Sequence, residues 1–99
     1  MEIRVLKYFL MVAREENITR AAALLHLTQP TLSRQLIQLE KELGTQLFHR
    51  SKHRVVLTDD GMLLKRRAQE IVSLAEKTEQ EFARHHGGEL TGEIMIGCG

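Results

Sequence analysis

Apolar side chains recur at spacings of three and four near the start of the chain, which is the pattern of a helix with one buried face. The pattern covers residues 3–15 and comprises Ile3, Leu6, Phe9, Leu10 and Ala13. Asn17 then interrupts it. We therefore expect a first helix over residues 3–15 that packs its apolar stripe against the rest of the domain.

A short alanine-rich segment follows this helix. Residues 21–25 are strong helix formers, and the hydroxyl of Thr19 can accept a hydrogen bond from a free backbone N–H one turn further on. We expect a second helix that is capped by Thr19 and ends at His26 and Leu27. Its small side chains would let another helix approach closely.

A third helix is predicted between Thr28 and Gly44. Thr28 is a favourable N-cap, Pro30 lies in the first turn where a missing N–H costs nothing, and Gly44 is a common C-terminal stop. The leucines on its expected core face are Leu32, Leu36, Leu39 and Leu43. The opposite face has one arginine and no carboxylate, and comprises Gln29, Thr31, Ser33, Arg34, Gln35 and Gln38.

Residues 45–58 have a different character. Leu47 and Phe48 are expected to return to the core, and residues 55–57 have β propensity. Between them, the run from His49 to Arg54 is dense in cationic and titratable groups. The segment predicts a small two-stranded hairpin with the basic run at its turn, supported by the helices because it is too short to stand alone.

A long last helix is predicted to begin after Thr58 and to run to about His86, before the two glycines at 87–88. Asp59 and Asp60 suit the positive end of its dipole, and its length is about 40 Å at 1.5 Å per residue. Its heptad-like seam comprises Leu64, Ala68, Ile71, Ala75, Thr78 and Phe82. Because only part of this seam can pack on the first helix, we expect a second chain to cover it.

Composition bounds the class of protein. The chain has 99 residues, of which 42% are hydrophobic and 27% charged, so it is neither membrane-embedded nor disordered. The single cysteine, Cys98, excludes an internal disulfide framework and fits a reducing compartment. No apolar run spans a bilayer, and the N-terminus lacks the order of a secretory signal. A cytoplasmic protein without membrane contact is expected.

The formal net charge of +1 conceals an asymmetry along the chain. Residues 1–67 carry 12 basic and seven acidic side chains, a net charge of +5, whereas residues 68–99 carry a net charge of −4. A basic block followed by an acidic one indicates a part that faces nucleic acid and a part with another task.

Residues 18–37 have the dimensions of a helix-turn-helix. In such a unit the second helix lies in the DNA major groove with its N-terminal residues toward the base edges. Arginine can donate two hydrogen bonds to guanine, glutamine pairs with adenine, and serine or threonine meets a base or a phosphate. The polar face of the third predicted helix has these residue types.

Five short stretches then follow one another in a specific order: ITRAA at 18–22, TQPTLSRQL at 28–36, LEKELG at 39–44, LFHR at 47–50 and LTDDG at 57–61. Together they closely resemble the N-terminal DNA-binding region of LysR-type transcriptional regulators, and the resemblance covers essentially the whole chain. Asn17 departs from it, since many members carry a glycine there.

The resemblance implies a mainly α fold. A winged helix-turn-helix of three helices and a two-stranded wing would cover residues 1–58, a linker or dimerisation helix residues 59–87, and the start of an effector-binding domain residues 88–99. It further implies double-stranded DNA with a partly symmetric operator as partner, a homodimer through antiparallel linker helices, and a tetramer as an option for the full-length regulator. A small-molecule effector would bind only to the domain that is missing after Gly99.

The resemblance also assigns DNA contacts. Those of the recognition helix fall on Gln29, Pro30, Thr31, Ser33, Arg34 and Gln35. Thr19 and Arg20 match the helix start that approaches phosphates, and Arg50, Lys52 and Arg54 match contacts to phosphates or the minor groove.

Other functions find less support. No residues are spaced for catalysis, and the adjacent His85 and His86 cannot face one way on a helix, so a helix-dipole contact is preferred to a metal site. No enzyme activity, cofactor or metal is therefore expected. A winged-helix protein-interaction module and a MarR-type regulator remain the two alternatives.

Overall fold

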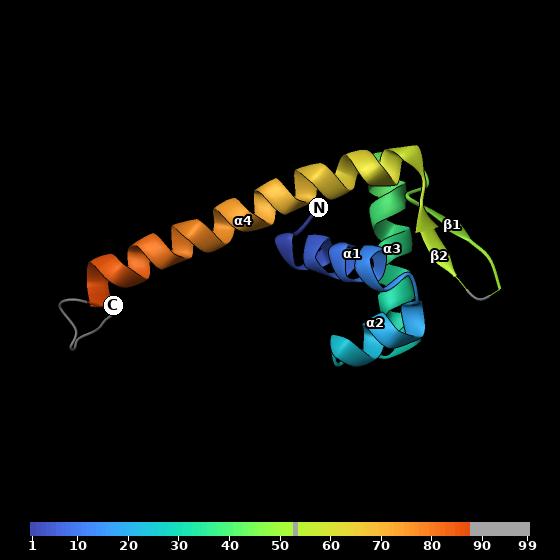
Figure 1. Ribbon diagram of the computed structural model, residues 1–99, viewed down its shortest axis with the longest axis horizontal. Coiled ribbons are helices and arrows are strands. Elements are labelled where there is room, and N and C mark those ends of the chain that lie inside the picture. The colour runs from blue at the N-terminus through green and yellow to red at the C-terminus, as the bar shows by residue number, and fades with distance from the viewer. Residues whose placement is uncertain (53, 88–99) are drawn as a thin grey trace.

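Within residues 1–52 and 54–87, which the computed structural model describes, three helices, a small sheet and a long fourth helix follow one another (Figure 1). The elements are α1 (Ile3–Glu15), α2 (Ile18–Leu24), α3 (Gln29–Leu43), β1 (Phe48–Arg50), β2 (Val55–Leu57) and α4 (Asp59–Gly87). This is the mainly α winged helix-turn-helix that the sequence predicts. Residues 88–99, where the start of an effector-binding domain is expected, lie outside the described residues, as does His53.

The cap of α2 differs from the prediction. Asn17, not Thr19, is the N-cap: its backbone is extended, and its side chain accepts a hydrogen bond from the Arg20 N–H at 2.8 Å. Thr19 lies inside the first turn, because the helix begins two residues earlier than expected. The preceding residue, Glu16, has the left-handed backbone (φ 54°) that glycine adopts most easily.

The predicted caps of α3 are confirmed. The Thr28 hydroxyl accepts from the Thr31 N–H at 3.4 Å, and Gly44 ends the helix with a φ of 71°. The prediction that Leu43 lies on the core face of this helix is wrong, since its side chain is 42% exposed. It is the last residue of α3, and the chain turns away toward β1 directly after it.

The core lies where α1, α2 and α3 meet the wing and the start of α4. It is mostly aliphatic, with one aromatic contact in which the Phe9 and Phe48 ring centroids are 5.3 Å apart. Leu47 and Phe48 are fully buried, as expected. They anchor the base of a hairpin that could not form alone.

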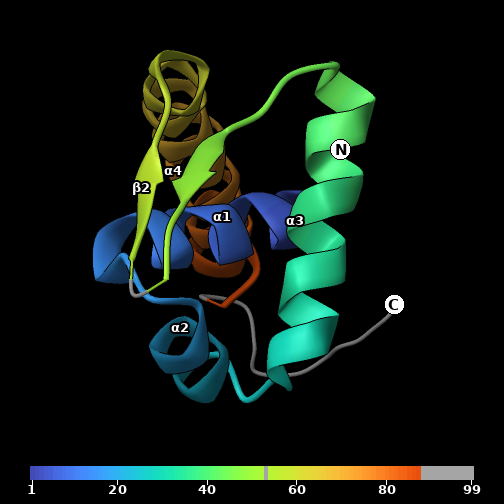
Figure 2. The same ribbon diagram turned by 90° about the vertical axis from the view of Figure 1, so that its right-hand side faces the viewer.

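The wing is an antiparallel pair in which Phe48 lies opposite Leu57 and Arg50 opposite Val55. Its turn is closed by the Ser51 N–H, which donates to the Arg54 carbonyl at 2.9 Å. The basic segment therefore occupies the tip of the wing. Figure 2 shows this tip, α2 and the N-terminal end of α3 directed toward the same end of the molecule.

Helix α4 begins as predicted, with the Thr58 hydroxyl accepting from the Gly61 N–H at 3.0 Å. Its first half packs on α1, and its second half extends away from the other elements (Figure 1). The first two positions of the expected dimer seam, Leu64 and Ala68, are consequently buried in the chain's own core, at 9% and 0% exposure. They leave little surface for a second chain, because the chain's own core already covers them. Among the described residues, no helix is long and apolar enough to cross a membrane.

Candidate nucleic-acid interface

The candidate interface is built on α3, whose two sides differ in exposure. Leu32, Leu36 and Leu39 are buried against the core and fix one side of the helix. Pro30 and Arg34 are exposed on the other side, where they can meet a large ligand. The leucine spacing thus determines which polar side chains point outward.

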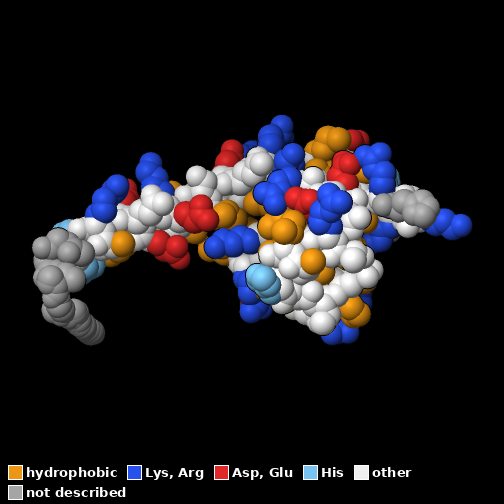
Figure 3. All heavy atoms as spheres, turned by 60° about the horizontal axis from the view of Figure 1, so that its bottom comes forward, with side chains coloured by type: hydrophobic (Ala, Val, Ile, Leu, Met, Phe, Trp, Pro, Cys, Tyr) orange, Lys and Arg blue, Asp and Glu red, His pale blue; other side chains and the backbone are white. Residues whose placement is uncertain are grey.

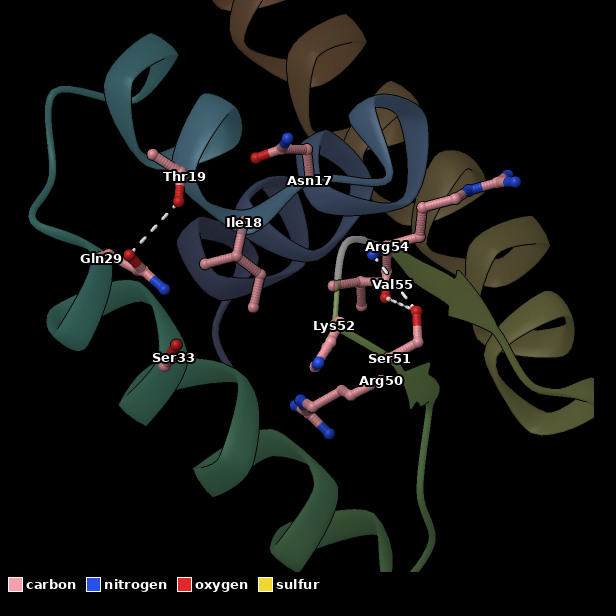
Figure 4. A pocket seen from close by; sticks show the side chains of 10 residues that line it. All are labelled: Asn17, Ile18, Thr19, Gln29, Ser33, Arg50, Ser51, Lys52, Arg54 and Val55. Atoms are coloured by element: carbon pink, nitrogen blue, oxygen red, sulfur yellow. Dashed lines mark hydrogen bonds between the residues drawn. The ribbon is translucent and has the colours of Figure 1, made fainter.

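A groove lies between the start of α3 and the wing. It has a volume of about 420 Å³, and its lining residues are Asn17, Ile18, Thr19, Gln29, Ser33, Arg50, Ser51, Lys52, Arg54 and Val55. Three cationic side chains and no carboxylate line it. Figure 4 shows the charged ends of Arg50 and Lys52 directed from the wing toward α3, while Arg54 points away from α3. The groove is therefore polar, positive and open to an anionic chain.

A hydrogen bond joins the two helices at the edge of this groove. The Thr19 hydroxyl donates to Gln29 Oε1 at 3.3 Å (Figure 4). Since Thr19 lies in the first turn of α2 and Gln29 begins α3, the contact fixes the N-terminal ends of both helices relative to each other. The first turn of each helix is capped within the chain, with the Arg20 N–H donating to Asn17 and the Thr31 N–H to Thr28.

Carboxylates partner several of the groove cations. Arg50 Nη2 lies 3.3 Å from Glu40 Oε1, and Arg54 forms an ion pair with Glu16. Lys52 has no ion pair among the contacts of the described residues. Lys52 is thus the cation that is most available to a ligand, although the resemblance favours Arg50 and Arg54.

The structure divides the predicted DNA contacts into four groups. The groove brings together Thr19, Gln29, Ser33, Arg50, Lys52 and Arg54. Pro30, Arg34 and Arg20 are exposed beside it, and Arg20 lies 3.9 Å from Glu15. Thr31 is half-buried, and its hydroxyl oxygen lies 2.8 Å from that of Thr28. Gln35 faces another hollow, next to Arg4 and Gln38, and is not part of the groove.

Sequence reasoning missed four residues of this region. Asn17 and Ser51 line the groove, and Glu40 and Glu16 hold two of its cations. Asn17 could have been found, because asparagine is as good an N-cap as threonine. The two glutamates could not, since their partners are 10 and 38 residues away in sequence.

The space-filling view gives the wider charge pattern. On the face shown in Figure 3, Lys and Arg side chains surround the globular end, and hydrophobic side chains are exposed along α4.

Within residues 1–52 and 54–87, no three His, Cys, Asp or Glu side chains are grouped as a metal site. The rings of His85 and His86 stand at 83° to each other.

Comparison with known proteins decides the family. Residues 3–62 match the sequence family described as bacterial regulatory helix-turn-helix protein, lysR family. The chain belongs to the LysR family. The MarR-type alternative is therefore wrong.

Curated LysR-like relatives include the HTH-type transcriptional regulator BsdA of Bacillus subtilis (strain 168), which is 44% identical over 98 residues. BudR of Klebsiella aerogenes, also an HTH-type transcriptional regulator, is 43% identical over 97 residues. In each case 98% of this chain is aligned, but the chain spans only 33% of BsdA and 67% of BudR.

Solved structures share the fold of this LysR chain. The CbnR_DBD–DNA complex superposes with a TM-score of 0.82 at 38% identity, covering 86% of this chain and 98% of that one. The complex of BenM_DBD with catB site 1 DNA gives 0.81 at 38% identity, covering 85% and 93%. These similarities establish the winged helix-turn-helix with its long helix.

Proposed function

We propose that this chain binds double-stranded DNA at specific sequences and thereby controls transcription as the DNA-binding region of a LysR-type regulator. The observation that carries the proposal is the positive, carboxylate-free groove between α3 and the wing, beside an exposed Arg34. The relatives named as transcriptional regulators and the similar chains solved as DNA complexes support it.

In this proposal the two parts of the interface have different tasks. The exposed N-terminal half of α3 enters the major groove, where Arg34 and Gln29 have the donors and acceptors that distinguish bases. The groove wall with Arg50 and Lys52 follows a phosphate backbone, which supplies affinity and orientation without sequence information. Arg20 and Thr19 add backbone contacts at the start of α2.

Residue Gln35 stays in the proposal with a reduced role. Its side chain lies in a hollow on the α1 side of α3, away from the groove. A contact from Gln35 to DNA therefore requires the duplex to cover more than one side of the helix. Thr31 is better placed to shape the first turn than to reach a base, because its hydroxyl is engaged with Thr28.

We also propose that two copies of the chain pair through α4. Leu74 and Phe82 are 65% and 62% exposed on this helix, and Ile71 and Ala75 are half-buried. The near half of α4 carries a basic cluster at 65–67, and the far half carries Glu76, Glu79 and Glu81. An antiparallel pair would place opposite charges side by side.

Such a dimer would present two recognition helices to a partly symmetric operator. A tetramer and a small-molecule effector belong to the proposal only for the longer regulator, through a domain that would follow residue 87. The proposed dimer also gives a reason for the charge asymmetry. Residues 1–67, with a net charge of +5, hold the parts that contact DNA, and residues 68–99, with a net charge of −4, hold the far part of the helix pair.

Selection of bound sequences from a random DNA pool tests the proposed function. A recurrent half-site with a fixed spacing is the expected result. Binding of the selected and of a random duplex is then measured across a salt series, and both affinities should fall steeply as salt rises. No enrichment, or an affinity that does not depend on salt, would instead favour the protein-interaction module.

A further inference from the structure

One carboxylate holds each side of the wing. On the β2 side, the Glu16 carbonyl accepts from the Val55 N–H at 3.2 Å, and the Glu16 carboxylate pairs with Arg54. On the β1 side, the carboxylate comes from Glu40 on α3. The second of these is the more buried, since the Glu40 side chain is 11% exposed and that of Glu16 is 43% exposed.

Glu40 makes four contacts with two different purposes. Its Oε2 accepts from the backbone N–H groups of Leu47 at 2.8 Å and Phe48 at 3.4 Å, which fixes β1 to α3. The same carboxylate receives both terminal nitrogens of Arg50, with Nη2 3.3 Å from Oε1 and Nη1 3.5 Å from Oε2. The two-point contact defines the plane and direction of the guanidinium, as a single contact would not.

Arg50 is restrained on a second side as well. Its guanidinium carbon lies 6.0 Å from the centroid of the Phe48 ring, and Phe48 is itself fully buried in the core. The side chain nevertheless lines the groove, with 36% of its surface exposed. Its remaining N–H donors can therefore reach a phosphate from a fixed position.

We propose that Glu40 is a positioning residue for DNA recognition, which holds Arg50 at one place on the groove wall. A fixed cation meets the backbone only in the register that also brings α3 to the matching base edges, whereas a mobile cation finds phosphates in any register. Phosphate contacts carry no sequence information directly, but they set the register in which bases are read. Glu40 thus raises the preference for the cognate site without touching DNA. This inference rests on the proposed function.

The substitution Glu40→Gln separates the two purposes of the carboxylate. A glutamine carbonyl can still accept from the Leu47 N–H, so the wing keeps its backbone anchor. The amide nitrogen cannot accept from Arg50, so the two-point contact is lost. We expect the ratio of the dissociation constants for random and selected duplexes to fall about tenfold, the size of one lost charge-assisted hydrogen bond. The ratio is the right measure because attraction common to all DNA cancels in it.

Glu42→Gln is the matched control. It removes the same charge from the same helix at a 43% exposed side chain whose contact is with the N-terminal amine. Its specificity ratio should equal that of the unaltered chain. An equal fall in Glu42→Gln would show a general charge effect and would overturn the proposal.

A double-mutant cycle with Arg50→Ala distinguishes positioning from a merely structural role. If Glu40 acts through Arg50, then Glu40→Gln lowers the ratio no further once Arg50 has been replaced. A further fall of similar size in the double variant would overturn the proposal, as would an unchanged ratio in Glu40→Gln. Circular dichroism spectra equal to that of the unaltered chain, at the temperature of the binding measurement, show that each variant is folded.

Arg50→Lys keeps the proposal testable should Glu40→Gln fail to fold. Lysine retains the charge but cannot make the two-point contact, so the ratio should again fall about tenfold. If Arg50→Lys has the same ratio of dissociation constants as the unaltered chain, the inference is contradicted. The proposed function has its own outcome in the same experiment, because it fails if the unaltered chain does not prefer the selected duplex.

Discussion

The junction between the wing and α4 has room for a hydrogen atom and nothing larger. A Cβ placed on Gly61 would lie 2.1 Å from the Leu47 carbonyl oxygen, which is backbone and cannot move aside like a side chain. Gly61→Ala should therefore lower the free energy of unfolding by about 3 kcal/mol, at the upper end of overpacking costs. Urea denaturation measures this change.

Gly44→Ala is the informative comparison for that prediction. Gly44 has a φ of 71° and nothing within 4 Å of the added Cβ, so its substitution costs only the backbone strain, about 1 kcal/mol. A smaller loss at Gly61 than at Gly44 would contradict the steric explanation.

Arg34 is where specificity is expected to reside. Its exposed side chain on the outer face of α3 can donate two hydrogen bonds to one guanine. Arg34→Ala should weaken binding to the selected duplex by about 1–3 kcal/mol and affect random DNA much less. Fluorescence anisotropy with the two duplexes measures this, and an unchanged ratio of affinities would rule out a base-reading role.

Substitution of the two candidate residues tests which one caps α2. Asn17→Ala removes the side-chain oxygen that accepts from the Arg20 N–H and should cost about 1 kcal/mol of stability. Thr19→Ala removes a different contact, the hydroxyl bond to Gln29, and leaves the cap intact. Thermal unfolding of both variants decides which residue caps the helix, since a larger loss at Thr19 would restore the original prediction.

Arg54, unlike Arg50, should contribute affinity with little sequence preference. Arg54→Ala is expected to weaken selected and random duplexes alike and to reduce the slope of log affinity against log salt by about one. Arg84→Ala, at the exposed far end of α4, removes the same charge and should leave the slope unchanged. A loss confined to the selected duplex would show that Arg54 reads bases.

The elements that the sequence predicts well are those with local patterns. Residues 3–15 form the predicted helix, although Ile3 at its start is 43% exposed, and Thr28 and Gly44 cap the two ends of α3 as their chemistry favours. The N-cap of α2 is harder to predict, because Asn17 and Thr19 are both good N-caps and lie two residues apart. Local pattern alone does not decide between them.

Contacts between distant residues escape such reasoning. Nothing near Glu40 in sequence shows that its carboxylate reaches the wing, and nothing near Leu64 shows that it is buried in the chain's own core. The six-residue seam on α4 has the correct period, but its first positions belong to the core of the same chain. Periodicity identifies an apolar face without identifying its partner.

For the whole molecule, the proposed dimer depends on the exposed part of α4. Leu74→Glu places a charge at the most exposed large apolar side chain of this helix and should raise the dimer dissociation constant more than about a hundredfold, since a two-fold pair loses the burial twice. Sedimentation velocity measures the change. Ser73→Glu adds the same charge on a neighbouring face, and an equal effect there would argue against a seam through Leu74.

Helix α4 is one uninterrupted element from Asp59 to Gly87. In a dimer paired through α4, the length of this helix sets the distance between the two recognition helices. One inserted residue lengthens it by about 1.5 Å and rotates everything beyond by about 100°. Insertion of a single residue in α4 would therefore misplace the two recognition helices relative to the operator. A change of about seven residues, or two helical turns, would restore the facing surfaces of the helix pair.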